Sequence, residues 1–258
     1  MPAGGAFVPE ARSIMITQIF MATLPGFAVG ALLMALNNRR TSPQIAREQW
    51  KKLGVYFLIV HVALACAAAG PISMFVFVVL IITLGASELR RASERVDMRP
   101  HGIRLLIWVA YTVVAATTVL MIPMLSSGIW VYIYLLVAVF DGFSQVVGQL
   151  VGRRLLAPSI SPGKTVEGAV GGLLAAVTVG IVFRDLVWPD PLPALLLAVA
   201  ISVAGLGGDL AASMVKRLCG IKDFGNALPG QGGVLDRFDS FLAASAIIGP
   251  IIYFTGVT

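Results

Sequence analysis

Long apolar stretches alternate with short polar intervals along almost the whole chain. A helix needs about 20 apolar residues to cross the hydrocarbon core of a membrane, and eight candidate stretches can be drawn. They lie at 14–36, 53–69, 71–87, 105–122, 128–150, 166–183, 192–213 and 239–255. Only Gly70 and Pro71 divide the second from the third, which fits either a tight turn or a break within a re-entrant pair. The pattern predicts an all-α polytopic membrane protein with about eight transmembrane helices.

Composition supports this fold class. The chain is 58% hydrophobic and 12% charged, with a mean hydropathy of +0.90, far outside the range of soluble domains. The longest polar intervals, near 37–52, 88–104 and 216–237, are the size of loops. We therefore expect one integral membrane domain over 1–258, with N-terminal helices in 1–125 and the segments that could carry chemistry in 126–258. The first residues show no cleavable signal, so the first span is expected to be retained.

Positive charge is distributed unevenly between the two sides of the predicted bundle. The intervals after the first, third, fifth and seventh stretches hold 17 of the 19 Lys and Arg residues. The positive-inside rule places these intervals in the cytoplasm. Because the cations are divided among short loops, nucleic acid is a poor candidate partner, and anionic lipid headgroups are better ones. The small size and the absence of targeting extensions favour a bacterial inner membrane.

Acidic residues gather near the same predicted face in the second half. Asp141 and Asp209 lie within apolar helices, where an unpaired carboxylate is costly, and Asp223, Asp236 and Asp239 follow. A structural ion pair is the alternative for either of the first two alone. Together the acids favour a cation, and oxygen ligands without a Cys or His cluster favour Mg²⁺, which completes its shell with water and substrate phosphate. The sequence therefore predicts a phosphorylated substrate.

Basic residues are interleaved with these acids. Lys216, Arg217, Lys222 and Arg237 could bring phosphate donors to the same place, although topology alone explains a single residue such as Arg217 equally well. The intervening glycines would let the backbone turn tightly and present N–H groups to phosphate. The segment matches no soluble nucleotide-binding motif.

A second polar cluster, GRRLLAPSISPGKTVEG at 152–168, precedes the sixth stretch. Ser161 and Pro162 resemble a helix start, which would leave Lys164 and Thr165 able to face a phosphate. Two glycines spaced as GxxxG follow at the start of that helix. This spacing is more often an intramolecular packing motif than a dimer contact in a chain with many helices, and a homodimer stays open.

Residues 141–240 closely resemble the phosphatidate cytidylyltransferases, also called CDP-diacylglycerol synthases. The family pattern runs Ser, two variable residues, Lys-Arg, four variable residues, Lys-Asp, then a Gly-rich stretch ending in Asp-Arg-x-Asp. Here it reads Ser213, Lys216-Arg217, Lys222-Asp223, Gly225-Asn226, Leu228-Pro229-Gly230, Gly232-Gly233 and Asp236-Arg237-Phe238-Asp239. The upstream blocks match at Asp141, at the Lys164 cluster and at Asp209.

The resemblance implies transfer of a cytidylyl group from CTP to phosphatidic acid, giving CDP-diacylglycerol and pyrophosphate in phospholipid biosynthesis. In-line attack by an ionised lipid phosphate needs positioning and charge neutralisation more than a strong base. The implied metal ligands are Asp209 and Asp236, with Asp141 and Asp223 as secondary ligands, and a second cation such as K⁺ is left open. The implied catalytic residues are Asp209, Asp236, Lys216 and Arg237, and the implied substrate-binding residues are Lys164, Thr165, Ser213, Arg217, Lys222, Asn226 and Gln231.

Three positions depart from the family pattern. Gln231 stands where His is usual, Ala212 where an acid commonly precedes the signature Ser, and Gly142 where Thr usually follows the first Asp. Gln can replace a hydrogen-bonding His but cannot shuttle a proton. The departures indicate a divergent branch, and we expect an active enzyme.

Two other functions fit parts of the pattern. A related transferase could use CTP with another lipid phosphate or a polyprenol phosphate, within the same chemistry. A lipid transporter or flippase would also place charges in a bundle, but it would more naturally show inverted repeats and interrupted helices in both halves. We find no such repeat in the sequence, which favours a single interfacial site.

Overall fold

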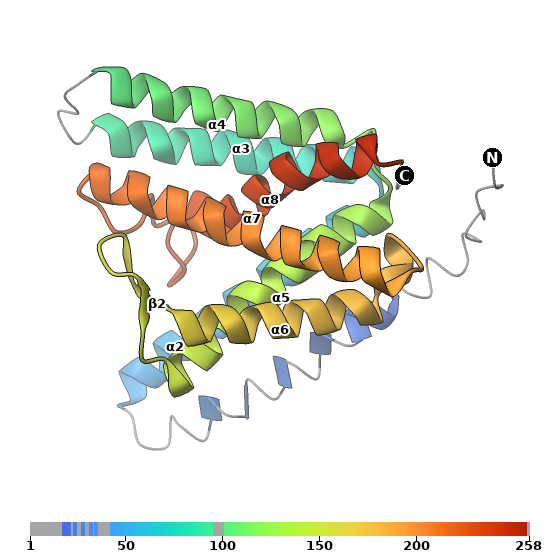
Figure 1. The fold of residues 1–258 in the computed structure, drawn as a ribbon. Coiled ribbons are helices and arrows are strands. Elements are labelled where there is room, and N and C mark those ends of the chain that lie inside the picture. The colour runs from blue at the N-terminus through green and yellow to red at the C-terminus, as the bar shows by residue number, and fades with distance from the viewer. Residues whose placement is uncertain are drawn as a thin grey trace.

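The computed structural model describes residues 42–94 and 101–256, together with short pieces between 17 and 35. Helices dominate the two long segments (Figure 1). They are α2 (Pro43–Ala68), α3 (Pro71–Glu94), α4 (His101–Met121), α5 (Ser127–Val151), α6 (Val166–Val182), α7 (Pro191–Leu218) and α8 (Leu235–Phe254). A two-stranded hairpin and a short 3₁₀ turn, Arg184–Leu186, complete these segments. The predicted all-α class is confirmed.

Six of the described helices are long and apolar enough to cross a membrane, and α6 is a shorter apolar helix. The protein is therefore an integral membrane protein. The first predicted span, 14–36, lies partly outside the described residues, and its described pieces are helical. The count of eight spans stays a prediction.

The helices extend beyond the apolar stretches that predicted them. The predicted stretch 53–69 corresponds to a helix that begins ten residues earlier, at Pro43, and 71–87 to one that continues to Glu94. Likewise, 192–213 continues to Leu218 and 239–255 begins at Leu235. Hydrophobicity marks the part of a helix suited to hydrocarbon, whereas backbone hydrogen bonding can continue into polar residues. Several predicted loop residues therefore lie on helices.

A tight turn separates α2 from α3. Gly70 adopts φ 112°, a conformation that side chains other than glycine rarely tolerate, and Pro71 begins the next helix. The division of the second and third stretches into two helices is confirmed in the structure.

Helix α5 lies at the centre of the molecule and packs along α6 (Figure 1). Its large side chains Trp130, Tyr132 and Leu136 are fully buried. The GxxxG glycines of α6 face it: a Cβ on Gly168 would lie 2.6 Å from the Ser144 carbonyl oxygen, and Gly172 is also buried against α5. Small residues let helix backbones approach closely in membranes. The motif is thus used within the chain, as the sequence favoured.

The hairpin corrects one expectation. Strands β1 (Leu155–Ala157) and β2 (Ser161–Thr165) pair antiparallel, so Ser161 and Pro162 lie in a strand and do not start the helix. Helix α6 begins after Thr165, whose hydroxyl accepts a hydrogen bond from the Gly168 N–H at 3.1 Å. Thr165 starts the helix because its side chain makes an N-cap hydrogen bond. Pro162 offered only the weaker preference for proline in a first helical turn.

The hairpin and the 219–234 loop lie at the same end of the bundle (Figure 1). At that end the first turns of α8 and the last turns of α7 meet, because these two helices pack against each other. The fold thus gathers the two polar clusters that the sequence separates.

Candidate active site

Asp209 is where the two polar clusters meet. It lies on α7, and its carboxylate forms an ion pair with Lys164, which β2 carries. One turn further along α7, the Ser213 hydroxyl lies 3.4 Å from the second Asp209 oxygen. These side chains are only partly exposed, so the pair is sheltered from bulk water. The hairpin therefore delivers an ammonium group directly to the acidic helix.

Lys216 and Asp236 form a second and more deeply buried ion pair. The Lys216 ammonium lies 2.9 Å from one Asp236 carboxylate oxygen, and the two side chains are 10% and 1% exposed. The other oxygen accepts backbone N–H groups of Phe224 at 2.8 Å and Gly233 at 2.9 Å. Charge-assisted bonds of this kind fix a loop strongly. Both oxygens of Asp236 therefore have protein partners in this structure.

Asp141 and Asp239 approach the same centre from α5 and α8. Asp141 interacts electrostatically with Lys164, Asp209 and Arg237. Asp239 feels the charges of Asp209, Asp141 and Lys216. Three carboxylates from three helices thus converge beside one lysine from the hairpin and one from α7.

One oxygen in this group lacks a partner. The first Asp239 carboxylate oxygen accepts the Ser240 N–H at 2.7 Å, whereas the second is buried and has no hydrogen-bond partner among the described residues. An unpaired buried carboxylate oxygen is costly, and such groups in proteins usually call for an ion or water. Asp239 therefore presents an acceptor to the centre.

The 219–234 loop reverses direction at two glycines. Gly230 and Gly232 have φ angles of 73° and 87°, which glycine adopts without strain. A bridge pairs Leu228 with Gly232, and the Gln231 N–H donates to the Leu228 carbonyl at 2.9 Å. The Gln231 side-chain amide donates to the carbonyl of Lys52 on α2 at 2.9 Å. The residue that departs most from the family pattern thus ties the loop to the N-terminal half.

Arg217 and Thr165, which were also predicted to bind substrate, have structural partners too. Arg217 donates from Nε to the Ile160 carbonyl at 3.0 Å and from Nη1 to the Ile221 carbonyl at 3.1 Å, which links the hairpin to the loop. Thr165 caps α6, as described above. Their predicted contacts with substrate stay predictions.

Other predicted residues are open to solvent. Lys222, Asp223, Asn226 and Arg237 are exposed around the loop and the start of α8. Asp223 stays near the buried centre, because a Cβ on Gly232 would be 3.5 Å from one of its oxygens and 3.1 Å from an Asp236 oxygen. Because these groups are exposed, a soluble nucleotide can reach them without any change in the loop.

Glu88 is a further residue of the site that was not predicted from the sequence. It is 4% exposed on α3, and its carboxylate accepts N–H groups from the start of α8. The predicted helix ended at 87, so Glu88 looked like the first residue of a polar loop. The burial of residues at helical spacing, Gly85, Glu88, Leu89 and Ala92, is the signal that the structure makes visible.

A metal ion would have to bind by rearranging or completing this set. Among the described residues, no three His, Cys, Asp or Glu side chains are already grouped closely enough to hold one. Oxygen donors nevertheless converge here, and Asp239 presents an unpartnered one. The donor type and the free acceptor fit Mg²⁺, whose sites usually use few carboxylates and several waters or phosphate oxygens.

Known proteins are similar to part of this chain. A phosphatidate cytidylyltransferase of Bacillus subtilis is 46% identical over 117 residues, which are 44% of this chain and 42% of the relative. One of Brucella melitensis is 44% identical over 123 residues, 46% of this chain and 44% of the relative. An uncharacterised Escherichia coli protein, YnbB, is 41% identical over 101 residues, 39% of this chain and 34% of that protein.

These matches span less than half the length of each relative. A broader comparison covers nearly the whole chain, because the sequence model of the cytidylyltransferase family matches residues 14–255. That range includes every carboxylate and lysine gathered at the centre described above. The chain belongs to the cytidylyltransferase family.

Proposed function

We propose that this protein transfers the cytidylyl group of CTP to phosphatidic acid, giving CDP-diacylglycerol and pyrophosphate. The observation that carries the proposal is the convergence of Asp141, Asp209 and Asp239 with Lys164 and Lys216 at one end of a membrane bundle. Relatives named phosphatidate cytidylyltransferase support the choice of lipid. The excess of Lys and Arg in the corresponding polar intervals supports a site open to the cytoplasm, in a bacterial inner membrane.

The reaction joins two anions. A phosphate oxygen of the lipid forms a bond to the α-phosphorus of CTP, and the bond from that phosphorus to the bridging oxygen breaks, so that pyrophosphate leaves with the electron pair. Because the lipid phosphate is already ionised near neutral pH, the protein must chiefly align the groups and offset their charge. Fixed cations in a sheltered site do this better than solvent, which must reorient.

The described cations suit this task in different ways. Lys164 and Lys216 are sheltered and already aligned by carboxylates, so each presents a positioned ammonium group. Arg237 is exposed beside Asp141, and Lys222 is exposed on the loop, where either can first meet the triphosphate. Arg is well suited to bidentate contact with phosphate, and Lys acts as a compact charge.

We further propose that Mg²⁺ is held by Asp209 and Asp239, with Asp141 beside them. Asp239 supplies the unpartnered oxygen, and Asp209 is the carboxylate whose present partner, Lys164, belongs to the phosphate-binding cluster. When bound, Mg²⁺ supplies charge neutralisation on the phosphates. Asp236 is a weaker choice than the sequence implied, because Lys216 and two backbone N–H groups hold both its oxygens.

The test uses purified protein in phosphatidate-containing detergent micelles, with labelled CTP and Mg²⁺. Labelled CDP-diacylglycerol and equimolar pyrophosphate are the expected products. Asp239→Asn should lower the rate at least about 100-fold, a loss typical of removing one group that stabilises transition-state charge. Asp185→Asn is the matched control, because Asp185 is a carboxylate in the turn before α7, near the opposite end of that helix.

A panel of lipid phosphates, including a polyprenol phosphate, identifies the acceptor. A CDP-linked product only with the polyprenol would replace phosphatidic acid as substrate while keeping the chemistry. Pyrophosphate release without any CDP-lipid would contradict lipid cytidylylation. An Asp239→Asn variant as active as Asp185→Asn would remove Asp239 from the proposed metal site.

A further inference from the structure

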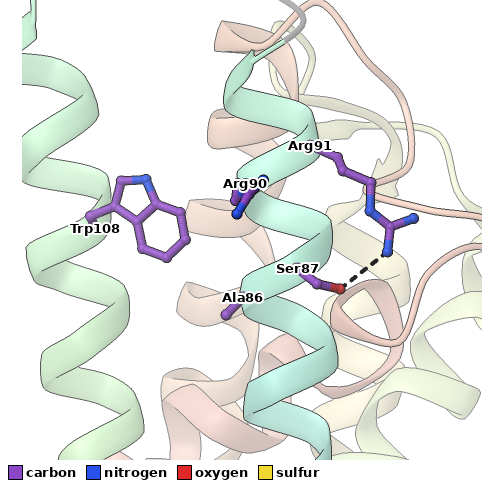
Figure 2. Close-up of a pocket in the computed structure, with 5 residues that line it drawn as sticks. All are labelled: Ala86, Ser87, Arg90, Arg91 and Trp108. Carbon is purple, nitrogen blue, oxygen red and sulfur yellow. Dashed lines mark hydrogen bonds between the residues drawn. The ribbon is translucent and has the colours of Figure 1, made fainter.

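Helix α3 carries a buried acid whose neighbours in sequence face another way. Ser87, Arg90 and Arg91 line a shallow surface depression shared with Trp108 of α4, and Arg91 donates to the Ser87 hydroxyl there (Figure 2). Glu88, between them in sequence, is 4% exposed and points into the protein. Since a carboxylate buried in a membrane bundle is costly unless it is well hydrogen-bonded, its partners indicate its purpose.

Those partners are the first N–H groups of α8. One Glu88 oxygen accepts from Val234 at 3.0 Å, and the other accepts from Leu235 at 2.9 Å. N–H groups at a helix start have no partner within the helix, and the positive end of the helix dipole favours a carboxylate there. Glu88 thus caps α8 from a different helix, 146 residues away in sequence.

Two glycines of the loop leave room for the Glu88 carboxylate. A Cβ on Gly225 would lie 2.6 Å from one Glu88 oxygen, and a Cβ on Gly233 would lie 2.5 Å from the other. Real Cβ atoms essentially never make contacts that close, so a side chain at either position would displace the carboxylate or the loop. The glycines therefore allow the backbone to pass directly over Glu88.

Glu88 and Asp236 together fix consecutive backbone groups. Asp236 accepts the N–H of Gly233, and Glu88 accepts the next two N–H groups along the chain. Asp236 follows immediately, and Asp239 comes one turn later on α8. The position of both site carboxylates is thereby tied to α3, in the half of the chain that lies outside the signature.

We infer that Glu88 is a positioning residue for cytidylyl transfer, acting through the loop and the first turn of α8. The inference rests on the proposed function for its catalytic readout. No contact of Glu88 reaches Asp209, Lys164 or Asp239 among the described residues, so it acts on the reaction by holding the backbone that carries the site. The N-terminal half then contributes to the geometry of the site as well as to the bundle.

Glu88→Gln is the direct test, because it keeps the size of the side chain but replaces one acceptor oxygen by an NH₂ donor facing an N–H group. Glu94→Gln is the matched control, since Glu94 is an exposed carboxylate on the same helix that pairs with Arg90. We expect Glu88→Gln to lower kcat about 100-fold, as displacement of a site by roughly 1 Å can do. The KM for CTP should change much less, because the exposed phosphate-binding groups remain.

Hydrogen exchange tests the same contact without relying on activity. The amides of Val234 and Leu235 should exchange faster in Glu88→Gln than in the control, while those in the middle of α5 should not change. If the wild-type protein fails to make CDP-lipid, the proposed function fails, and the exchange result still decides whether Glu88 holds the loop. Equal exchange and equal kcat in Glu88→Gln and Glu94→Gln would overturn the inference.

Gly225→Ala provides a second variant that approaches the contact from the opposite side. Its methyl group would press on Glu88, whereas Gly102→Ala, where nothing lies within 4 Å, is the control. Lower kcat with faster exchange at the start of α8 would support positioning. A smaller yield of folded protein with unchanged kcat per folded molecule, in both Glu88→Gln and Gly225→Ala, would reduce Glu88 to a purely stabilising residue and refute the inference.

Discussion

The buried pair of Lys216 and Asp236 makes a quantitative prediction about stability. Lys216→Met removes the ammonium group but keeps a long, flexible, apolar side chain in its place. Asp236 then stays at 1% exposure without its counter-charge, although it keeps the N–H groups of Phe224 and Gly233. The variant therefore isolates the contribution of the charge from that of the backbone bonds.

Breaking a buried ion pair by removing one partner costs about 3–5 kcal/mol. Because two charge-assisted hydrogen bonds to Asp236 survive, we expect the lower end, about 3 kcal/mol. For a domain of this size, that corresponds to a fall in Tm of roughly 6–12 °C. Asp236→Asn added to Lys216→Met should recover part of the loss, since the unpaired charge is then gone.

Thermal unfolding in detergent, followed by tryptophan fluorescence, measures this effect. Lys51→Met is the control, because Lys51 lies 3.9 Å from Glu48 in a pair with both side chains more than half exposed. Such pairs contribute little to stability. If Lys216→Met melted within about 2 °C of Lys51→Met, the buried pair would not stabilise the fold as argued.

Three further variants or measurements test separate parts of the structure. Gly172→Ala would press a methyl group against α5 and should destabilise the protein by about 1–3 kcal/mol in the same melting assay. Gly54→Ala, where the added methyl group meets open space, is the control, and equal melting of the two variants would refute the close packing of α5 on α6. Gln231→His should retain activity within about threefold and add no new ionisation to the pH–rate profile, because a ring N–H can replace the amide that donates to the Lys52 carbonyl. A large rise in rate would mean that a titrating group is needed at this position. Burial raises the pKa of the Cys219 thiol, so less of it is thiolate at pH 8 than in a peptide, and iodoacetamide should react with it more slowly. The difference in rate should shrink as the pH approaches the raised pKa, and a rate equal to that of a peptide thiol would contradict the burial.

Much of the site could be predicted because its residues are close in sequence or lie in a recognisable order. The stretch from Ser213 to Asp239 contains both signs of charge in an apolar chain, and the cost of charge near hydrocarbon makes such a stretch informative. The Lys164 cluster was predicted separately, and the structure joins it to Asp209. Spacing alone could not show which oxygens were already used by protein donors.

The assignment of individual carboxylates illustrates that limit. Asp236 and Asp239 are three residues apart and equally acidic in sequence, yet one has partners for both oxygens and the other has a buried oxygen without one. The difference depends on where Lys216 and the 219–234 loop reach α8. These are tertiary contacts that hydrophobic periodicity does not encode.

Composition and local residue order are enough to predict the class of protein and to locate its charged segments, because transfer free energy depends on composition and a signature depends on local order. Three other features are found only in the folded chain: Ser161–Thr165 is a strand, Gln231 reaches α2 and Glu88 caps α8. The strand pairs with the residues just before it in the chain, whereas the Gln231 amide and the Glu88 carboxylate have backbone partners far away in the chain. Such distant partners are set by how the helices pack, so a single residue in the N-terminal half, outside the signature, can hold the site of the other half in place.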